Sequence, residues 1–563
     1  RSYRAALAAE PRHVAAALNL ANMLFRRAQY ADLLEVTETA FGPDAPAPVR
    51  LLRALAQERL GDPGGAEATL REAIALRPRE ATLHAYLGTL YVRKGRYTDA
   101  ESELSRALEL APDSAYALSM LAHAHQRQCA WSGLGDMFSR IDKLATESTG
   151  EAVAIDAFAA LAMPLSLQAQ LQIARRWAER TAPAQAPAPP QLDYAPGERL
   201  RVGFVTWNLR DHPTMHLSLE FWEKIDRRRL EMFLYALRPS DENPFERRAR
   251  AAFEHYVDVS ALSVAAIAQR IREDRIGILI DRNGYTLNAR EALFALKPAP
   301  LQVNCIGFPG TLGAPWYDYI FTDRFSLPEE LAGFYTERPL YMPHMAFPSD
   351  TTRLPAGPAP SRAACGLPES GFVFCCFNNA YKILPEVFAL WMRLLGATPG
   401  SVLWLLEPGA PAKANLRREA QAAGVDAARL LFAPRVSVSE HVARHAAADL
   451  FLDTYPYGAH TTANDALLAG LPLITRVGET LASRIAGAQL AAIGLPELIT
   501  SSLADYEALA LKLTREPALL ADYRARLAAN RTSSPLFDMT RYARDFEALM
   551  LEAWARRAPP ARP

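Results

Sequence analysis

A 34-residue spacing near the start of the chain limits the possible fold more than any other feature of the sequence. Pro78 and Pro112 are 34 residues apart, as are Gly61 and Gly95. A period of this length is typical of a helix–turn–helix unit that cannot bury its apolar face alone, so neighbouring units must stack. We therefore predict an α superhelix whose concave surface is available to another chain.

The clearest unit, residues 81–112, matches the tetratricopeptide pattern. The matching positions are His84, Leu87, Gly88, Tyr91, Ala100, Leu104, Ala107 and Pro112. The small residues at Gly88 and Ala100 allow two antiparallel helices to approach closely. Looser copies are expected at 12–45 and 48–78, and a degenerate one at 115–144. We assign residues 1–145 to the repeats and leave two interpretations open, a surface that binds a protein or peptide and a plain helical spacer.

Residues 146–197 are expected to form a helical linker followed by a Pro/Ala-rich loop, because successive prolines exclude a helix interior. Beyond them, short apolar runs alternate with helical patterns, as in largely parallel sheets covered by helices. The expected strands are 201–206, 232–237, 276–281, 302–306, 319–322, 372–377, 401–406, 430–432, 450–452 and 473–475. We predict two α/β halves facing a cleft, at 198–370 and 371–535, and a C-terminal helix and tail at 536–563.

The charge balance gives no electrostatic case for binding nucleic acid or an acidic membrane, because 62 Lys and Arg residues face 62 Asp and Glu residues. Five cysteines without a CxxC spacing favour a reducing compartment over a disulfide framework. No apolar stretch approaches the roughly 20 residues that span a bilayer. We therefore expect a cytoplasmic protein with no nucleic-acid and no membrane partner.

The stretch 453–470 is where we expect the chemistry. An apolar strand ends in a Pro/Gly turn that brings His460, Thr461 and Thr462 to the start of a helix, which Gly470 closes. A helix start has free N–H groups and a partial positive charge, so it suits a phosphate or diphosphate. Asp465, one turn later, is placed to accept hydrogen bonds from sugar hydroxyls. The alternative is that one of the two threonines merely caps the helix.

Other candidate residues also follow predicted strands. His212 precedes Pro213 at a helix entry, where it is either a general base or a capping residue. His212 and His216 have the i, i+4 spacing of a metal pair, but no third ligand is evident, and we expect no metal. The loop 307–313 contains three glycines that allow a ligand or a tight turn. Lys382 lies at another strand end, either beside an anion or as a solvated surface lysine.

Several nucleotide-binding and hydrolytic motifs are missing from the sequence. We find no P-loop, no Gly-x-Gly-x-x-Gly after Val202 and no Gly-x-Ser-x-Gly elbow. These absences weigh against a nucleotide triphosphatase, a dinucleotide dehydrogenase and an α/β hydrolase. No Asp-x-Asp triplet is present either, so charge compensation without a divalent cation is expected from Lys382 and the Thr461/Thr462 helix start.

Together these motifs resemble the O-linked N-acetylglucosamine transferase family, and a bacterial member is expected. The resemblance covers nearly the whole chain. It is carried by the repeats and by residues 212–217, 283–286, 298–300, 307–314, 341–344, 377–378, 381–382, 458–462, 478–484 and 533–537.

The resemblance implies a GT-B fold, that is, two Rossmann-like domains facing a cleft that holds UDP-N-acetylglucosamine. It also implies inverting, metal-independent transfer of the sugar to Ser or Thr hydroxyls of a protein that lies along the repeat groove and the cleft. His212 and Lys382 take the catalytic positions, and whether His212 is the base stays open. The positions that correspond to UDP-sugar contacts are Gly307, Pro309, Asn379, Tyr381, Val436, His441, Arg444, His460, Thr461, Thr462 and Asp465.

The chain departs from the family pattern at two positions. Asn379 replaces the usual Gln beside the phosphates, and Val438 replaces the usual Lys of the uridine loop. Loss of a charge-assisted hydrogen bond is worth roughly 1.5–3 kcal/mol, so UDP affinity is expected to fall about tenfold or more. Two alternatives remain beside the transferase, another UDP-sugar GT-B transferase and a tetratricopeptide scaffold whose transferase half is weak or inactive.

Overall fold

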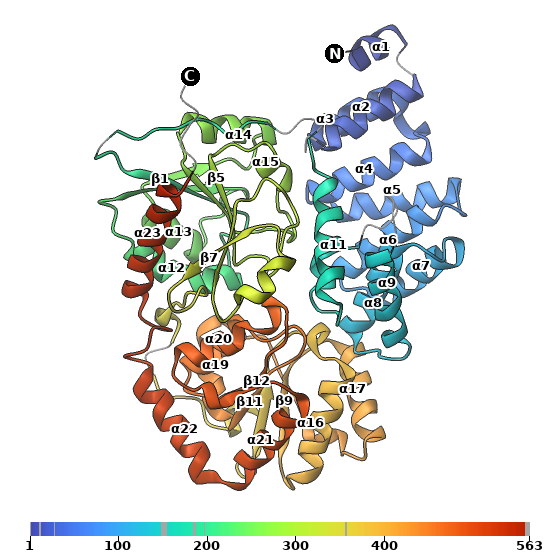
Figure 1. Ribbon diagram of the computed structural model, residues 1–563. Coiled ribbons are helices and arrows are strands. Elements are labelled where there is room, and N and C mark those ends of the chain that lie inside the picture. The colour runs from blue at the N-terminus through green and yellow to red at the C-terminus, as the bar shows by residue number, and fades with distance from the viewer. Residues whose placement is uncertain are drawn as a thin grey trace.

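The computed structural model describes residues 2–10, 13–26, 29–147, 155–183, 187–195, 197–354 and 357–557. Figure 1 shows three regions: a helical stack on the right, and two α/β halves one above the other on the left. No helix in the described ranges is both long and apolar enough to cross a bilayer. The three-region arrangement confirms the predicted superhelix followed by two Rossmann-like domains.

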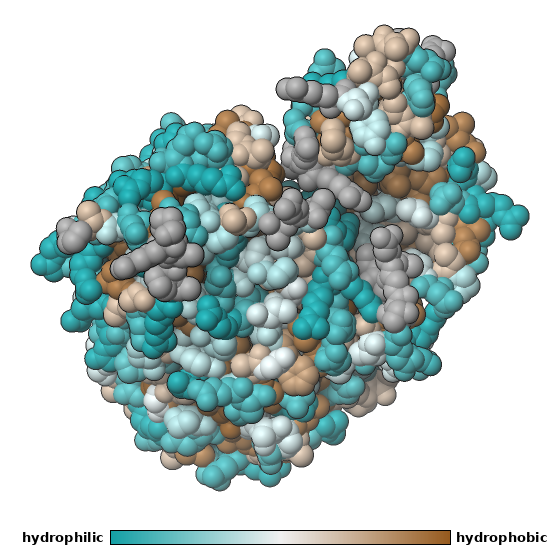
Figure 2. Space-filling model, turned by 45° about the horizontal axis from the view of Figure 1, so that its top comes forward, coloured by the Kyte–Doolittle hydropathy of each residue, from teal (hydrophilic) through white to brown (hydrophobic). Residues whose placement is uncertain are grey.

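The helical stack consists of antiparallel helix pairs after a short helix α1 (Ser2–Ala9). The pairs are α2 (Val14–Arg26) with α3 (Tyr30–Phe41), α4 (Ala47–Arg59) with α5 (Pro63–Leu76), α6 (Ala81–Arg93) with α7 (Tyr97–Leu110), and α8 (Ala115–Gln128) with α9 (Leu134–Glu147). Close approach within the third pair depends on Gly88, because a Cβ there would lie 2.6 Å from Leu104 Cγ. Figure 2 shows hydrophobic residues at the surface of this region, where Leu60 and Leu76 are more than half exposed.

The first α/β half is a seven-stranded parallel sheet in the order β3-β2-β1-β4-β5-β6-β7. Its strands are β1 (Leu200–Thr206), β2 (Leu230–Ala236), β3 (His255–Asp258), β4 (Ile278–Asp281), β5 (Leu301–Cys305), β6 (Tyr319–Asp323) and β7 (Arg338–Met342). The helices between them include α12 (Pro213–Lys224), α13 (Pro244–Ala252), α14 (Val264–Glu273) and α15 (Glu291–Ala295). The edge strands β3 and β7 were not predicted from the sequence.

The second half is a six-stranded parallel sheet in the order β10-β9-β8-β11-β12-β13. Its strands are β8 (Val373–Cys376), β9 (Val402–Leu406), β10 (Leu430–Ala433), β11 (Leu450–Leu452), β12 (Leu473–Arg476) and β13 (Ile499–Thr500). Its helices are α16 (Pro385–Ala397), α17 (Ala410–Ala422), α18 (Val438–Arg444), α19 (Thr461–Leu468), α20 (Ile485–Ala492), α21 (Leu503–Arg515) and α22 (Pro517–Asn530). Since all strands of each sheet are parallel, their carboxyl ends gather at one edge, where ligands of such sheets bind.

The last helix, α23 (Met539–Ala555), returns from the second half to cover the first sheet (Figure 1). Its buried face joins the core of the first half, where Phe546 is 1% exposed and its ring lies 5.7–6.0 Å from those of Phe204, Phe221 and Phe321. The two halves are thus connected twice, by the segment after β7 and by the segment before α23.

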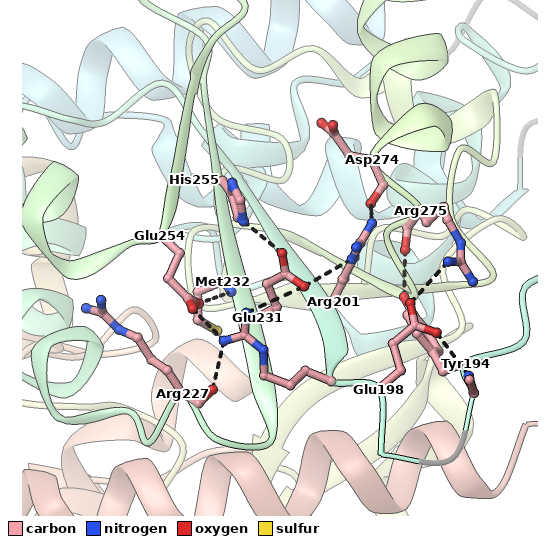
Figure 3. Close-up of polar contacts among 12 residues, drawn as sticks. Tyr194, Glu198, Arg201, Arg227, Glu231, Met232, Glu254, His255, Asp274 and Arg275 are labelled. Carbon is pink, nitrogen blue, oxygen red and sulfur yellow. Dashed lines mark hydrogen bonds and ion pairs between the residues drawn. The ribbon is translucent and has the colours of Figure 1, made fainter.

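A charged network fastens the segment before β1 to the amino-terminal edge of the first sheet (Figure 3). Tyr194 donates a hydrogen bond to the carbonyl of Arg275, at 2.6 Å, and Glu198 pairs with the same arginine. Arg201 on β1 pairs with Glu231 on β2, which also contacts His255 on β3. This network lies at the edge opposite the carboxyl strand ends, so it serves the fold and leaves the other edge to the site.

The repeat stack is joined to both α/β halves. Helix α11 (Leu167–Glu179) packs its backbone so closely against the first half that a Cβ on Gly313 would lie 2.3 Å from the nitrogen of Arg175. From α8, Gln126 donates to the carbonyl of Tyr381 in the second half. These contacts are made with the loops that follow the carboxyl ends of β5 and β8.

Candidate functional site

A cavity of about 580 Å³ opens where the repeats and the two sheet edges meet. Nine of the thirteen predicted site residues lie on its wall. They are His212, Gly307, Pro309, Asn379, Tyr381, Lys382, His460, Thr461 and Thr462. Val436, His441, Arg444 and Asp465 do not line it.

The turn between β11 and α19 is held by Asp453, a buried carboxylate that sequence reasoning treated only as the end of a strand. Its Oδ1 accepts hydrogen bonds from the backbone N–H of Thr454 and Ala459, at 2.7 and 2.6 Å, and its Oδ2 accepts one from the Thr475 hydroxyl. Asn378, at the end of β8, also donates to Asp453 Oδ1. The neighbouring strand ends are thus fixed to one another around this turn.

The start of α19 carries no side-chain cap, so the prediction that Thr461 or Thr462 caps this helix is wrong. His460 occupies the capping position without a capping hydrogen bond, and the Thr462 hydroxyl donates instead to Asn378 Oδ1. Among the described residues, no hydrogen-bond acceptor is found for the backbone N–H groups of residues 461–463. Because Thr461 and Thr462 line the cavity, the helix start presents unused donors to an anion there.

Lys382 lies at the opposite side of the same turn and is buried, so the solvated alternative is wrong. Its Nζ donates to the carbonyl of Gly458 at 2.8 Å and lies 3.8 Å from the centre of the Tyr457 ring. Burial lowers the pKa of the Lys382 ammonium, and the nearby Asp453 carboxylate opposes that effect. The ammonium uses one of its three protons on Gly458, which leaves donors for a ligand in the cavity.

His460 was predicted to contact a phosphate, but its ring proton is used within the protein. Its Nε2 lies 3.0 Å from the carbonyl oxygen of Ala482, which can only accept, so the ring proton of the neutral imidazole is assigned to Nε2. Burial and the charge of Lys382 keep the pKa of His460 well below its usual range. The nitrogen that remains is an acceptor. His460 therefore shapes the turn, and donation to a phosphate falls to the backbone and Lys382.

His212 is the residue that caps α12. Its Nδ1 accepts from the backbone N–H of Thr214 at 3.3 Å and lies 2.9 Å from the Thr214 hydroxyl. Burial, with the charge of Arg210, lowers the pKa of His212 to about 4. With Nδ1 as the acceptor, the proton of the neutral ring is on Nε2. The predicted capping role is confirmed, and His212 also lines the cavity.

The glycine-containing loop after β5 is compact because the protein itself fills the space beside it. A Cβ on Gly307 would lie 2.0 Å from the carbonyl oxygen of Arg282. The buried carboxylate of Glu337, which the sequence analysis missed, accepts hydrogen bonds from the Thr311 hydroxyl and the Leu312 N–H, at 2.6 and 2.7 Å. The glycines thus serve tight internal packing, which brings Gly307 and Pro309 to the cavity wall.

The remaining predicted residues form a second cluster behind α19. Asp465 is 5% exposed, and its Oδ1 is paired with Arg353, which was not among the predicted site residues. His441 Nε2 lies 3.9 Å from Asp465 Oδ2, and Arg444 donates to His441 and stacks on Phe377. Val436 is 43% exposed at the entrance to α18. Burial lowers the pKa of His441 to about 3, so this cluster holds a neutral imidazole between the Asp465–Arg353 ion pair and the Arg444 guanidinium.

Metal-ligating side chains do not gather in the described ranges: no group of three or more His, Cys, Asp or Glu residues is placed to hold an ion. His216, the i, i+4 partner of His212, instead contacts Asp211 at 2.7 Å.

Comparisons with known proteins identify the family of the chain. The model of glycosyl transferase family 41 matches residues 158–356 and 358–546, and a tetratricopeptide repeat model matches residues 59–124. An Arabidopsis thaliana protein described as a probable UDP-N-acetylglucosamine–peptide N-acetylglucosaminyltransferase is 36% identical over 455 residues, which is 77% of this chain and 46% of that protein. A Caenorhabditis elegans UDP-N-acetylglucosamine–peptide N-acetylglucosaminyltransferase is 31% identical over 64% of this chain and 41% of its own length. The chain thus spans less than half of these relatives.

A solved structure of an O-GlcNAc transferase from Thermobaculum terrenum matches almost end to end. It covers 96% of this chain and 98% of its own, with a TM-score of 0.70 and 28% identity. The similarity therefore extends over the repeats and both α/β halves together.

Proposed function

Because the chain belongs to glycosyl transferase family 41, we propose that it transfers N-acetylglucosamine from UDP-N-acetylglucosamine to a Ser or Thr hydroxyl of a polypeptide. The observation that carries the proposal is the uncapped start of α19 facing Lys382 across one turn. A diphosphate is the ligand that such a pair of donors fits.

The reaction is an in-line displacement at the anomeric carbon. The acceptor oxygen forms the new bond and loses its proton, and the bond to the UDP oxygen breaks with its electron pair. Negative charge grows on the leaving diphosphate, where the Lys382 ammonium and the N–H groups of residues 461–463 are already oriented. Donors fixed in a water-poor site give the largest electrostatic stabilisation.

The uridine of UDP is proposed to lie toward the second cluster, which is formed by Asp465, His441 and Arg444. Asp465 Oδ2 is not used by Arg353 and remains an acceptor for a ribose hydroxyl. The backbone at Val436 and the side chains of His441 and Arg444 border the same entrance. Since these residues are off the wall of the present cavity, UDP must displace side chains there, and binding is proposed to widen the cavity toward α18.

The role of His212 follows from its hydrogen bonds. A ring with its proton on Nε2 and Nδ1 occupied by Thr214 donates to an oxygen and does not take up a proton. We therefore assign His212 to orienting a substrate oxygen. Transfer is further proposed to need no divalent cation, since Lys382 supplies the positive charge; full activity after treatment with EDTA is the expected result.

The direct test is mass spectrometry of Ser/Thr-containing polypeptides incubated with the protein and one UDP-sugar at a time. UDP-N-acetylglucosamine is expected to add one N-acetylhexosamine, with UDP released in equal amount. Preferential transfer from UDP-glucose would leave a GT-B transferase of another specificity. Absence of both transfer and UDP binding would leave only a tetratricopeptide scaffold.

A further inference from the structure

Three arginines on the cavity wall share a position in successive repeats. Arg59, Arg93 and Arg127 are 34 residues apart and lie in the last turns of α4, α6 and α8, the first helices of three consecutive pairs. All three line the cavity of about 580 Å³. Residues at equivalent positions of stacked repeats form a row along the superhelix, so these side chains make a ladder.

The ladder ends at the donor site. Arg127 stacks on Tyr381 with its guanidinium carbon 4.3 Å from the ring centre, and Tyr381 precedes Lys382 in the chain. Arg93 and Arg59 follow one and two repeats farther away. A chain that presents its hydroxyl beside the diphosphate would therefore pass along this row.

Only Arg93 of the three ladder arginines is held in a close ion pair within the described residues. Arg93 pairs with Glu58 at 2.7 Å, and Arg127 contacts His123 at 3.1 Å. Within the described ranges no close ion pair is found for Arg59 or Arg127. The two acidic residues on the cavity wall act at longer range, Glu291 on Arg59 and Asp156 on Arg93. A helix C-terminus stabilises a cation, which explains a basic residue at each place but not why all three face one cavity.

We propose that the arginine ladder binds acidic side chains of the acceptor polypeptide and so selects acceptors with Asp or Glu on one side of the modified hydroxyl. The planar guanidinium fork matches a carboxylate with two parallel hydrogen bonds. The apolar wall beside the ladder, including Phe158 and Trp177, suits a polypeptide. This inference rests on the proposed transferase function, because only then does a polypeptide enter the cavity.

The test measures binding without requiring transfer. A fluorescent peptide containing one Ser in a run of Glu and Ala is compared by anisotropy with the same peptide carrying Gln for Glu, in the presence of saturating UDP. The Glu peptide is expected to bind more tightly, and the preference should shrink as ionic strength rises. Equal binding of the two peptides would overturn the proposal. Calorimetry with UDP alone reports separately on the donor site.

Single substitutions test which arginines cause the preference for the Glu peptide. Arg59→Gln and Arg93→Gln are each expected to weaken binding of the Glu peptide about two- to fivefold, the range of a partly exposed charge pair, while UDP affinity and Gln-peptide binding stay unchanged. The matched control is Arg106→Gln, an exposed arginine of α7 that pairs with Glu109 and lies off the cavity wall.

Charge reversal separates recognition from a structural role. A folded Arg59→Glu/Arg93→Glu variant is expected to prefer a Lys-containing peptide over the Glu peptide. A variant that loses affinity for all three peptides equally would contradict the ladder. An RNA oligonucleotide that competes as well as the Glu peptide at equal charge would overturn the assignment to a polypeptide.

Discussion

At the scale of single residues, the site depends on donors that the fold leaves free. Lys382 is fixed by Gly458 and Tyr457 before any ligand arrives, and the Asp453 carboxylate holds the turn that supplies Gly458. These groups are already ordered in the folded protein. A bound diphosphate is therefore stabilised by them without a further loss of conformational entropy.

Removal of the Lys382 charge tests this arrangement. Lys382→Met is expected to abolish measurable transfer and to weaken UDP binding, while circular dichroism and the melting temperature stay close to those of the native chain. The control is Lys413→Met, which removes a surface ion pair with Glu407. Transfer within tenfold of wild type in the Lys382 variant would exclude the lysine from stabilising the leaving group.

The lowered pKa of Lys382, to about 8, predicts a pH dependence of UDP binding. Only the ammonium form attracts the diphosphate, and that form is complete well below pH 8 and lost as the pH rises through this value. Calorimetric UDP affinity is therefore expected to fall between pH 8 and 9, a range in which the terminal phosphate of UDP, with a pKa of about 6, no longer titrates. An affinity that rises across that interval would contradict the assignment.

His212 should matter for rate without setting the pH profile. His212→Ala is expected to lower kcat about a hundredfold, the size of effect that misplacement of a reacting group by about 1 Å can have. Because the pKa of His212 is about 4, its ring is neutral at every pH above 5, and the profile of kcat/KM between pH 5.5 and 7.5 should keep its shape. A variant within a few-fold of wild type would remove His212 from the chemistry.

The place of a residue in the fold could be predicted where it depends only on the order of strands and loops along the chain. Residues at strand ends, such as Lys382 and Thr461, were placed near the cavity by the parallel-sheet rule alone. Their hydrogen bonds were not, because partners such as Asn378 for Thr462 and Ala482 for His460 come from distant segments. The 34-residue spacing of Arg59, Arg93 and Arg127 is present in the sequence. Only the structure shows that all three side chains line the same cavity.

At the scale of elements, the central strands and the edge strand β10 were predicted, and the other three edge strands were not. β3 is polar and half-exposed, β7 contains Pro339, and β13 has two residues. All three lie at sheet edges, where one face of the strand has no partner and the apolar run that identifies a buried strand is lost.

The turn before α19 is the element whose disruption should be most damaging. Asp453→Ala would leave buried donors of Thr454, Ala459 and Thr475 without their acceptor. The expected loss is about 2–4 kcal/mol in the free energy of unfolding, with UDP affinity weakened as well. Denaturant unfolding followed by calorimetry checks both. The control is Asp505→Ala, an exposed carboxylate at the start of α21. Native stability in the Asp453 variant would show that the turn does not depend on it.

At the scale of the whole molecule, the C-terminal helix ties the two halves together. Phe546→Ala on α23 is expected to lower the free energy of unfolding by about 3–5 kcal/mol, the usual cost of removing a buried aromatic ring. Arg544→Ala, on the exposed side of the same helix, is the control. Because α23 packs on the first half, UDP binding to the second half should persist in native conditions. An unchanged unfolding curve would contradict the packing described for this helix.

The most direct measurement of the central claim is a crystal structure of the chain with UDP. The account predicts the β-phosphate at the start of α19, with oxygens within hydrogen-bond distance of Lys382 Nζ and of the N–H groups of residues 461–463. Density for UDP elsewhere, or residues 458–465 closed against a nucleotide at saturating concentration, would contradict it.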